Sequence, residues 1–485
     1  MATVKACLLN EALDRIFTTT GRRLTLKDEQ EEAIKSLLSG RDVLAILPTG
    51  FGKSLIFQLF AIAKSVEATR YSTSPGTVLV ICPLDSIVKD QITEAESYGL
   101  KAVSLSTCSE NIFEQMNDVP DVVFASAEAA SLKAFRESLN KKRNVHAIVV
   151  DESHTVETWT GKRNKKDKAF RSAYGDLSIL RSFCKKGTPF LALTGTADTK
   201  TQGTIISLLS LKDPVKILIS PERTNLRISV TECKKATILQ KLDWLIDLTL
   251  EKGLNMPKTI IFCNMMNEIA SVCNYLLLKM GKDVYYEAAD GTRTCIVGIY
   301  HSMTWAGTKK KLLESFKGCG NDSIQRIIIA STALSMGVNF PDVHYVINWG
   351  PPRTLIDYHQ EAGRAGRDGQ HAHSIIIYHG NQTAHCEDDV KHFVRTEGCY
   401  RVASLKPFVP NVVPVEPLHD CCSTCSLICK CSDSCSKSKL PFEKDIIPDQ
   451  EAPQPPRKRD LSDQQRDDIR DALTNLRTSS STIAL

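Results

Sequence analysis

Long hydrophobic runs are absent from this sequence. No apolar stretch among its 485 residues approaches the roughly 18 residues that a membrane-spanning helix needs. The first residues also lack a basic segment followed by a long apolar core, which is the pattern of a secretory signal. We therefore expect a soluble, intracellular protein without membrane contact.

Strong charge of one sign is absent too. The chain has 61 Lys and Arg against 56 Asp and Glu, a net charge of +5, and only 6% of its residues are aromatic. Any nucleic-acid-binding surface must then come from a local patch, because bulk charge would not supply it. A disulfide framework is not expected, since 17 cysteines, an odd number without an export signal, favour free thiols and a metal site.

What is present is an alternation of apolar, strand-like runs with helical patterns. The runs fall at residues 43–47, 77–83, 121–126, 145–152 and 189–195, and again at 258–263, 295–300, 326–331, 344–349 and 373–379. Such alternation is typical of an α/β fold with parallel sheets and helices on both faces. The irregular stretch near residue 222 predicts two similar domains joined there. Their ligands are expected at the carboxyl ends of the strands.

The segment LPTGFGKS, residues 47–54, combines a turn with a lysine and a serine. It departs from the phosphate-loop pattern, because Leu47 stands where the first glycine is usual. Its setting between a strand-like run and a helical run still favours nucleotide binding, with Lys53 on the outer phosphates and Ser54 on Mg²⁺. The backbone amides expected to face the phosphates are those of Thr49, Gly50, Phe51 and Gly52. The alternative is a helix-capping turn with an exposed lysine.

Two further motifs carry charge that phosphoryl transfer uses. Asp151 and Glu152 follow a strand-like run, where Asp151 can hold Mg²⁺ and Glu152 can polarise the attacking water. In QEAGRAGRDG, Gln360, Arg364 and Arg367 lie on a glycine-spaced segment, and arginines from a second domain can neutralise phosphoryl charge. The alternatives are two acids that cap the next helix and a solvated basic turn.

Residues 154–174 interleave cations with aromatic side chains. Trp159 and Phe170 flank a basic insert, which holds Lys162, Arg163, Lys165, Lys166 and Lys168. This mixture suits single-stranded nucleic acid, because cations follow phosphate while rings stack on bases. The alternative is an exposed loop whose charges are only solvated.

The C-terminal part has a different character. Cysteine crowds into residues 421–435, and the proline- and charge-rich stretch 448–460 cannot bury a core. A short helix is expected after it, since Ser462 and Gln465 have capping-box spacing and apolar residues follow on one face. That helix is expected to dock on the body or on a protein partner, and a frayed tail is the alternative.

The order of these motifs resembles the superfamily-two helicases of the RecQ type. The resemblance rests on LKDEQEEAI, LPTGFGKS, DESH, LALTGTA, TIIFCN, IYHSMT and the run from IIIASTALSMG to QEAGRAGRDG, over about residues 24 to 380. The phosphate loop of this superfamily typically lacks the first glycine, which accounts for Leu47. The resemblance implies two tandem RecA-like domains, 1–222 for ATP binding and 223–384, then a small zinc-binding helical module, 385–436, and a mostly disordered polar tail, 437–485.

Several residue roles follow from the resemblance alone. It implies that Gln30 reads the adenine with Lys27 nearby, and that His154 links the ATP state to motion. It also implies that Arg364 and Arg367 complete the ATP site across an interdomain cleft. The DNA-contacting residues that it implies are Trp159, Phe170, Arg171, Asn264, His301 and Ser331. This chain departs from the family in its basic insert, which lengthens the link between the tryptophan and the Phe-Arg pair.

A zinc module is also implied by the resemblance. A Cys-Tyr-Arg start at Cys399 and the Cys-x-x-Cys spacing of Cys422 and Cys425 resemble the family's module. Tetrahedral zinc needs four ligands, so one is still to be assigned. The candidates for this fourth ligand are Cys421, Cys429 and Cys431, of which we take Cys429. Free reduced thiols are the alternative.

The leading hypothesis is an ATP- and Mg²⁺-dependent DNA helicase that moves 3′ to 5′. It would act in the nucleus and unwind duplex or branched DNA during repair, recombination or replication. One alternative is an RNA helicase of the DEAD type, which usually shows Ser-Ala-Thr where this chain has TGTA at residues 194–197. Another is an ATP-binding DNA scaffold with weak unwinding, although every catalytic position is filled.

Overall fold

The computed structural model of the chain describes residues 2–105, 119–142, 145–161, 163, 170–287, 291–318, 323–335, 338, 340, 342–431, 440–443 and 464. The chain divides into two compact units, Met1–Lys439 and Leu440–Leu485. In the second unit the described residues are Leu440, the 3-10 helix η8 (Pro441–Glu443) that follows it, and Gln464. The predicted C-terminal helix with Ser462 and Gln465 lies outside the described residues. Of the helices that are described, none has the length and apolar character needed to cross a bilayer.

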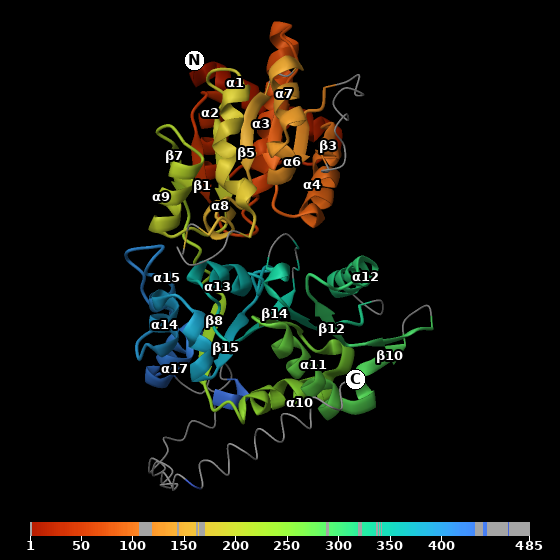
Figure 1. Ribbon diagram of the computed structural model, residues 1–485, viewed down its shortest axis with the longest axis vertical. Coiled ribbons are helices and arrows are strands. Elements are labelled where there is room, and N and C mark those ends of the chain that lie inside the picture. The colour runs from red at the N-terminus through yellow and green to blue at the C-terminus, as the bar shows by residue number, and fades with distance from the viewer. Residues whose placement is uncertain are drawn as a thin grey trace. The chain divides into compact units, whose positions relative to one another are not determined.

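The first sheet is parallel throughout and has the strand order β3-β4-β2-β5-β6-β1-β7 (Figure 1). Its strands are β1 (Val43–Ile46), β2 (Thr77–Ile81), β3 (Ala102–Leu105), β4 (Val122–Ala125), β5 (Val145–Val150), β6 (Phe190–Thr194) and β7 (Val215–Leu218). The central strands are apolar at nearly every position, because both faces of a parallel sheet are covered. All strands predicted for the first half of the chain are present, and β3 and β7 add an edge strand on each side.

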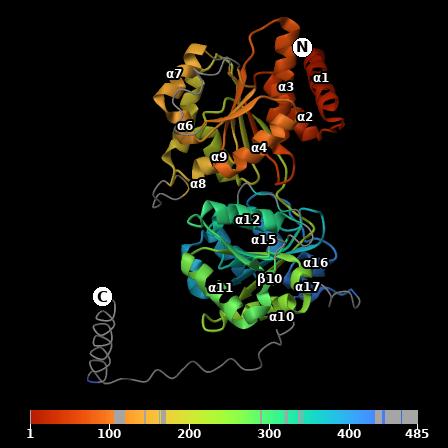
Figure 2. The same ribbon diagram turned by 90° about the vertical axis from the view of Figure 1, so that its right-hand side faces the viewer.

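Helices cover both faces of this sheet (Figure 2). One face packs against α1 (Ala2–Thr20), α2 (Asp28–Leu38), α3 (Lys53–Tyr71) and α4 (Asp85–Ser97). The other packs against α6 (Ala127–Ser131), α7 (Lys133–Lys142), α8 (Thr155–Thr158), the 3-10 helix η1 (Ser172–Phe183) and α9 (Thr199–Leu208). Alternate residues of each strand serve the two cores, so Val43 and Ala45 lie in one and Leu44 and Ile46 in the other. We call this assembly the first lobe.

The second lobe contains another parallel sheet, with the order β12-β13-β9-β14-β15-β8. Its strands are β8 (Leu226–Glu232), β9 (Lys258–Cys263), β12 (Val297–Tyr300), β13 (Ile327–Ala330), β14 (Val343–Trp349) and β15 (Ala372–Tyr378). All strands predicted for this half are present. The sequence did not predict β8, nor the antiparallel pair of β10 (Tyr285–Glu287) and β11 (Arg293–Cys295). The predicted fold class, two parallel-sheet domains, is confirmed.

The helices of the second lobe are mostly short. They are α10 (Asp243–Lys252), α11 (Met266–Met280), α12 (Ala306–Lys317), α13 (Leu355–Ala362), α14 (Asp388–Arg395), α15 (Tyr400–Leu405), α16 (Leu418–Cys421) and α17 (Ser423–Ile428). The described part of this lobe also has the 3-10 helix η2 (Ile238–Leu242) before α10, and η3 (Gly253–Asn255), η4 (Gly281–Val284), η5 (Thr332–Leu334) and η6 (Gly380–His385) between the later helices.

The cysteine-rich segment packs into the core of the second lobe. Cys421, Cys422 and Cys425 share a buried cluster with Ile228 of β8 and Phe393 of α14. The backbone joins it to the sheet as well, because Cys422 forms an isolated parallel bridge with Ile228. The fold of this segment is therefore tied to the edge of the second sheet.

The strand ends bring the predicted motifs together. In the first sheet, β5, β6 and β1 are neighbours, and all three run in the same direction. The phosphate loop follows β1, the two acidic residues follow β5, and Thr194 closes β6. Their side chains therefore meet at one edge of the sheet, as expected for a parallel α/β fold.

Candidate active site

The phosphate loop wraps the start of α3. Helix α3 begins at Lys53, and Gly52 precedes it in a left-handed conformation with φ 85°. A Cβ at Gly52 would lie 2.7 Å from Nε2 of Gln30, so the position favours glycine on two counts. Gln30 Nε2 donates to the carbonyls of Phe51 (2.9 Å) and Gly52 (3.1 Å). Gln30 thus braces the loop, and its expected contact with adenine stays a prediction.

The side chains of this loop remain accessible. Phe51, Gly52, Lys53 and Ser54 are half-buried, and the Nζ of Lys27 lies 3.8 Å from the centroid of the Phe51 ring. Thr49 is also half-buried, and Gly50 is exposed. The loop can therefore be reached by a ligand from solvent.

The ammonium of Lys53 and the hydroxyl of Ser54 already have protein partners. Lys53 Nζ donates to the Leu47 carbonyl (3.2 Å), and Ser54 Oγ donates to Glu94 Oε2 (3.0 Å). Gly195 lies against the ammonium, since a Cβ at this glycine would be 3.6 Å from Lys53 Nζ, an ordinary van der Waals contact. The sequence did not predict Glu94, because it lies on α4 and no motif marks it.

Asp151 and Glu152 form a crowded pair at the end of β5. Asp151 is buried and accepts from the Glu152 amide (3.0 Å) and from Gln91 Nε2 (3.2 Å). Burial and the neighbouring Glu152 carboxylate raise the pKa of Asp151 to about 6, although Lys53 acts to lower it. Glu152 has φ +46°, a region that non-glycine residues rarely adopt and that often marks functional sites. These hard oxygen donors suit Mg²⁺, whose charge would relieve their repulsion.

A buried chain of polar side chains joins the two lobes. His154 Nδ1 lies 2.9 Å from Thr194 Oγ1, and His154 Nε2 lies 2.9 Å from Gln360 Nε2. Burial and the nearby Lys53 lower the pKa of His154 to about 3, so the ring is neutral. The Thr194 hydroxyl donates to the Thr196 carbonyl (3.1 Å), so its oxygen accepts from Nδ1. Nε2 is then left to accept from the amide of Gln360.

Arg364 is buried in the second lobe, and Arg367 is half-buried beside it. Arg364 donates to the carbonyls of Val338 and Ser335, and Arg367 Nε donates to the Gly363 carbonyl (3.2 Å). Burial lowers the pKa of Arg364 to about 10, and burial together with Arg364 lowers that of Arg367 to about 8. The negative charge of Glu152 instead acts to raise the pKa of both guanidinium groups. Both arginines therefore lie within electrostatic reach of Glu152.

The aromatic loop keeps its rings together despite the basic insert. The Trp159 ring contacts Phe170 and Tyr174 edge-on, with centroids 5.5 Å and 5.3 Å apart. The Trp159 carbonyl accepts from the amides of Phe170 (2.7 Å) and Arg171 (3.0 Å). These hydrogen bonds hold the backbone that follows the basic insert beside Trp159, which precedes the insert. Phe170 is 75% exposed, whereas Trp159 is half-buried against Tyr174.

The structure contradicts the expected role of Arg163 as a phosphate contact. Its side chain is only 8% exposed. Arg163 donates to Glu157 Oε2 (3.1 Å), Asp198 Oδ2 (3.0 Å) and both carboxylate oxygens of Glu387 (2.6 and 2.7 Å). Burial acts to lower the pKa of Arg163, but Glu387 and Asp198 raise it above its usual value. Three carboxylates attract this cation more strongly than solvent or a screened phosphate would, so it points inward.

The remaining lysines of the insert, Lys162, Lys165, Lys166 and Lys168, lie outside the described residues. Arg171 also differs from expectation, because its guanidinium is held in a two-pronged ion pair with Glu128 and donates to the Pro83 carbonyl (2.6 Å). Its charge is already matched within the protein. The Arg171 guanidinium also lies over the rings of Trp159 and Tyr174, so this residue positions the aromatic loop.

The three second-lobe residues implied as DNA contacts lie at adjacent strand ends. Asn264 follows β9, His301 follows β12 and Ser331 follows β13, and these strands are neighbours. Asn264 is exposed, and the other two are half-buried. Each has a local partner: Asn264 Nδ2 donates to the Pro351 carbonyl (2.9 Å), His301 Nδ1 accepts from the Met303 amide (3.2 Å) and Ser331 Oγ accepts from the Ala333 amide (3.4 Å).

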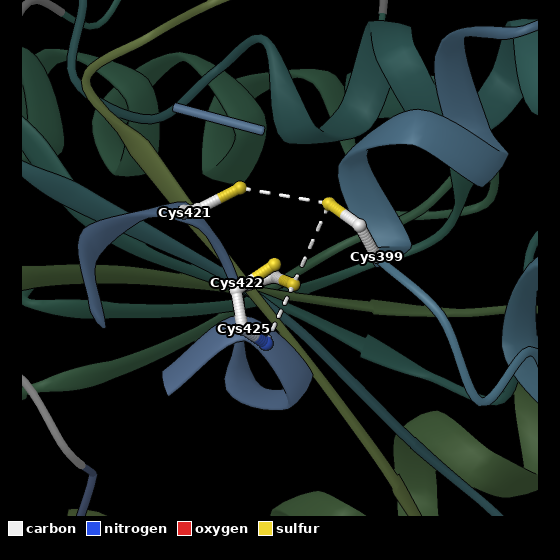
Figure 3. Close-up of side chains that lie close together, drawn as sticks. All are labelled: Cys399, Cys421, Cys422 and Cys425. Atoms are coloured by element: carbon white, nitrogen blue, oxygen red, sulfur yellow. Dashed lines mark hydrogen bonds between the residues drawn. The ribbon is translucent and has the colours of Figure 1, made fainter. Parts of the chain in front are cut away.

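Four thiols converge near the edge of the second sheet (Figure 3). They are those of Cys399, Cys421, Cys422 and Cys425. Our choice of Cys429 as the fourth member is wrong, because its thiol groups with His419 and Cys431 instead. Cys422 bridges to β8, and this register turns the adjacent Cys421 toward Cys399 at 3.6 Å. Spacing alone did not distinguish these neighbouring cysteines.

The four-thiol cluster has the dimensions of a tetrahedral zinc site. Zinc–sulfur bonds of about 2.3 Å place the sulfurs of a tetrahedron about 3.8 Å apart. The Cys399 sulfur lies 3.6 Å from that of Cys421 and 3.9 Å from that of Cys422. The donor set therefore fits zinc.

Comparisons with known proteins agree with this arrangement. The chain matches the DEAD/DEAH box helicase family over residues 27–205 and the helicase conserved C-terminal domain over residues 240–369. It is 29% identical to ATP-dependent DNA helicase Q-like 2 of Arabidopsis thaliana, covering 86% of this chain and 56% of that protein. It is 30% identical to the probable ATP-dependent DNA helicase RecS of Bacillus subtilis, covering 76% of this chain and 66% of that protein.

The chain thus spans about half to two thirds of the length of these relatives. Among solved structures, S. cerevisiae Dbp5 bound to RNA and ADP BeF3 has a TM-score of 0.55 and 15% identity, over 79% of this chain and 95% of that chain. At this identity the likeness concerns the fold. The helicase-family matches and the RecQ relatives agree, and this chain belongs to the RecQ-type family of superfamily-two helicases.

Proposed function

We propose that this chain is an ATP-dependent DNA helicase that moves 3′ to 5′ and unwinds duplex or branched DNA. The buried chain from Thr194 through His154 to Gln360 carries the proposal. It connects the lobe that holds the phosphate loop to the lobe that holds the arginines. A change at the nucleotide site would therefore reach the second lobe through three side chains in direct contact. The relatives named ATP-dependent DNA helicases support the same activity.

The roles of the site residues follow from their chemistry. Bound Mg²⁺ would neutralise phosphate charge, with Ser54 and Asp151 as its protein-side holders. Lys53 would release the Leu47 carbonyl and bind the outer phosphates. Glu152 would take the proton of the attacking water.

Gln360 and the arginines act from the second lobe. The Oε1 of Gln360 is buried and has no hydrogen-bond partner within the described part of the chain, so it can accept from the attacking water. Arg364 and Arg367 would stabilise the negative charge that spreads over the transferring phosphoryl group. The burial of Arg364 makes its interaction stronger, because little water screens it.

DNA is proposed to lie across the aromatic loop and the strand ends of the second lobe. Phe170 offers an exposed ring for stacking, and Lys162, Lys165 and Lys166 would bind phosphate. Trp159 would then act mainly as the support of Phe170, since it is itself packed on Tyr174. Zinc in the four-thiol cluster would stabilise the segment that packs on β8. The nucleus, repair, recombination and replication remain the proposed setting, with protein partners at the C-terminal tail.

An unwinding assay tests the proposed function. Forked duplexes with a 3′ or a 5′ single-stranded tail are incubated with the protein and Mg²⁺-ATP, and strand separation is followed. We expect separation of the 3′-tailed DNA only, and ATP hydrolysis stimulated by single-stranded DNA. Stronger stimulation by RNA of the same sequence would favour the RNA-helicase alternative. DNA binding without stimulated hydrolysis would favour the scaffold.

Replacement of the exposed ring should separate DNA sensing from hydrolysis. In Phe170→Ala we expect the DNA concentration for half-maximal ATPase stimulation to rise roughly 5- to 150-fold, because a stacked base contributes about 1 to 3 kcal/mol. Hydrolysis without DNA should stay unchanged. Tyr71→Ala is the matched control, since it removes another exposed ring at the end of α3. Equal DNA dependence in the two variants would remove Phe170 from the DNA contact.

A further inference from the structure

A second group of metal-binding side chains lies close to the four-thiol cluster. It consists of His419, Cys429 and Cys431, whose ligand atoms all lie within 4.8 Å of one another. His419 Nδ1 is 2.9 Å from the Cys431 sulfur and 3.4 Å from the Cys429 sulfur. The two sulfurs are 2.9 Å apart, closer than the about 3.8 Å between zinc-bound sulfurs, so they would move apart around a bound metal. We propose that these three residues form a second zinc site.

The two groups share no ligand. A tetrahedral structural site is complete with four thiolates, so the four-thiol cluster has no use for a further donor. Helix α16 contributes Cys421 to the first group and His419 to the second. The residues after α17 bring Cys429 and Cys431 back to His419. The chain therefore supplies two separate sets of donors within a short segment.

His419 presents one ring nitrogen to the two thiols. Its Nδ1 faces both sulfurs, while its Nε2 lies on the side of Asp420, 3.7 Å from Oδ2. The backbone is fixed as well, because Arg227 Nε of β8 donates to the His419 carbonyl (2.7 Å). The imidazole is buried, so its direction is set before a metal arrives.

The donor set selects zinc and leaves one coordination position. Two thiolates with one imidazole suit zinc, which takes four ligands in a tetrahedron. Cys431 is exposed, so water or another small donor can reach the fourth position. The four-thiol cluster is more enclosed, since Cys421, Cys422 and Cys425 are all buried. We expect the second site to exchange its metal faster than the first.

Zinc content per chain tests the proposal directly. The whole chain is purified under reducing conditions with zinc present, and unbound metal is removed. The molar ratio of zinc to protein is then measured by elemental analysis. We expect two zinc ions per chain in the wild type and one in Cys429→Ser and in Cys431→Ser. Cys7→Ser, which removes another exposed thiol, should keep two. Circular dichroism of the Cys431→Ser variant checks that it is folded, which we expect because this thiol is exposed and can be replaced without opening a core.

Two further readouts identify the ligands. Release of zinc to a chromogenic chelator should be biphasic in the wild type, and only the fast phase should disappear in Cys431→Ser. Cobalt substitution should show a thiolate charge-transfer band that loses part of its intensity in Cys429→Ser. One zinc per chain in the wild type, unchanged in both serine variants, would overturn the proposal. Loss of all zinc in Cys431→Ser would also overturn it. So would a disulfide between Cys429 and Cys431 that persists in the protein purified under reducing conditions.

Discussion

Replacing Lys53 by Ala should reduce the ATP hydrolysis rate about a hundredfold or more, while DNA binding stays nearly unchanged. The ammonium of Lys53 is the positive charge that acts on both Asp151 and His154, and it lies in the loop that opens α3. Loss of one preorganised electrostatic donor typically costs at least about 2.7 kcal/mol of transition-state stabilisation. The rate is measured at saturating ATP with saturating single-stranded DNA, so that weaker nucleotide binding does not mask the effect.

A matched control for this variant lies on the same helix. Lys64 of α3 pairs with Glu67 at 2.7 Å on a partly exposed surface, and such a pair contributes about 1 kcal/mol or less. Lys64→Ala should therefore keep its hydrolysis rate and its DNA affinity. Melting temperatures of both variants establish that each is folded. Full hydrolysis by folded Lys53→Ala would mean that this loop does not hold the phosphates, and the proposed site would fall.

The sheets could be predicted from the sequence because their central strands are continuous apolar runs. Buried parallel strands such as β5 and β9 carry side chains into cores on both faces, and this leaves a plain signal. The edge strands β3 and β7 are half exposed and only four residues long, so their pattern blends with the loops around them. Strand β8 was missed because its neighbours in sequence are irregular, although it completes the second sheet.

The site could be predicted only where its residues are close in sequence. Lys53 with Ser54, and Asp151 with Glu152, are read from short motifs at strand ends. The contact between His154 and Gln360 spans 206 residues, and the sequence did not predict it. Glu94, which binds the Ser54 hydroxyl, belongs to no motif and could not be foreseen.

Charge counting failed at Arg163 for a related reason. In the sequence Arg163 is one more cation of the basic insert, and no neighbouring residue distinguishes it from the lysines. Its partners come from three other places, Glu157 of α8, Asp198 before α9 and Glu387 before α14. Only the folded chain brings these carboxylates together. The insert is thus in part an internal connection between the lobes, and not only a surface for DNA.

Replacing Arg163 by Ala should therefore lower stability far more than DNA affinity. Removing it leaves Glu157, which is fully buried, and Asp198 without their cation, and breaking a buried ion pair in this way costs about 3 to 5 kcal/mol. We expect a clear fall in melting temperature. The slope of log affinity for DNA against log salt should not change, whereas each lost phosphate contact would reduce it by about 0.7 to 0.9.

Two comparisons make this test specific. Arg41→Ala removes a cation whose pair with Asp213 is exposed and 3.8 Å long, so its melting temperature should hardly move. A double-mutant cycle with Glu387→Ala measures how much of the loss comes from the pair that joins the lobes, because the two side chains are in direct contact. Strong coupling is expected, since Glu387 accepts two hydrogen bonds from Arg163. A reduced salt slope with an unchanged melting temperature would instead restore Arg163 as a phosphate contact, as its place in the basic insert first indicated.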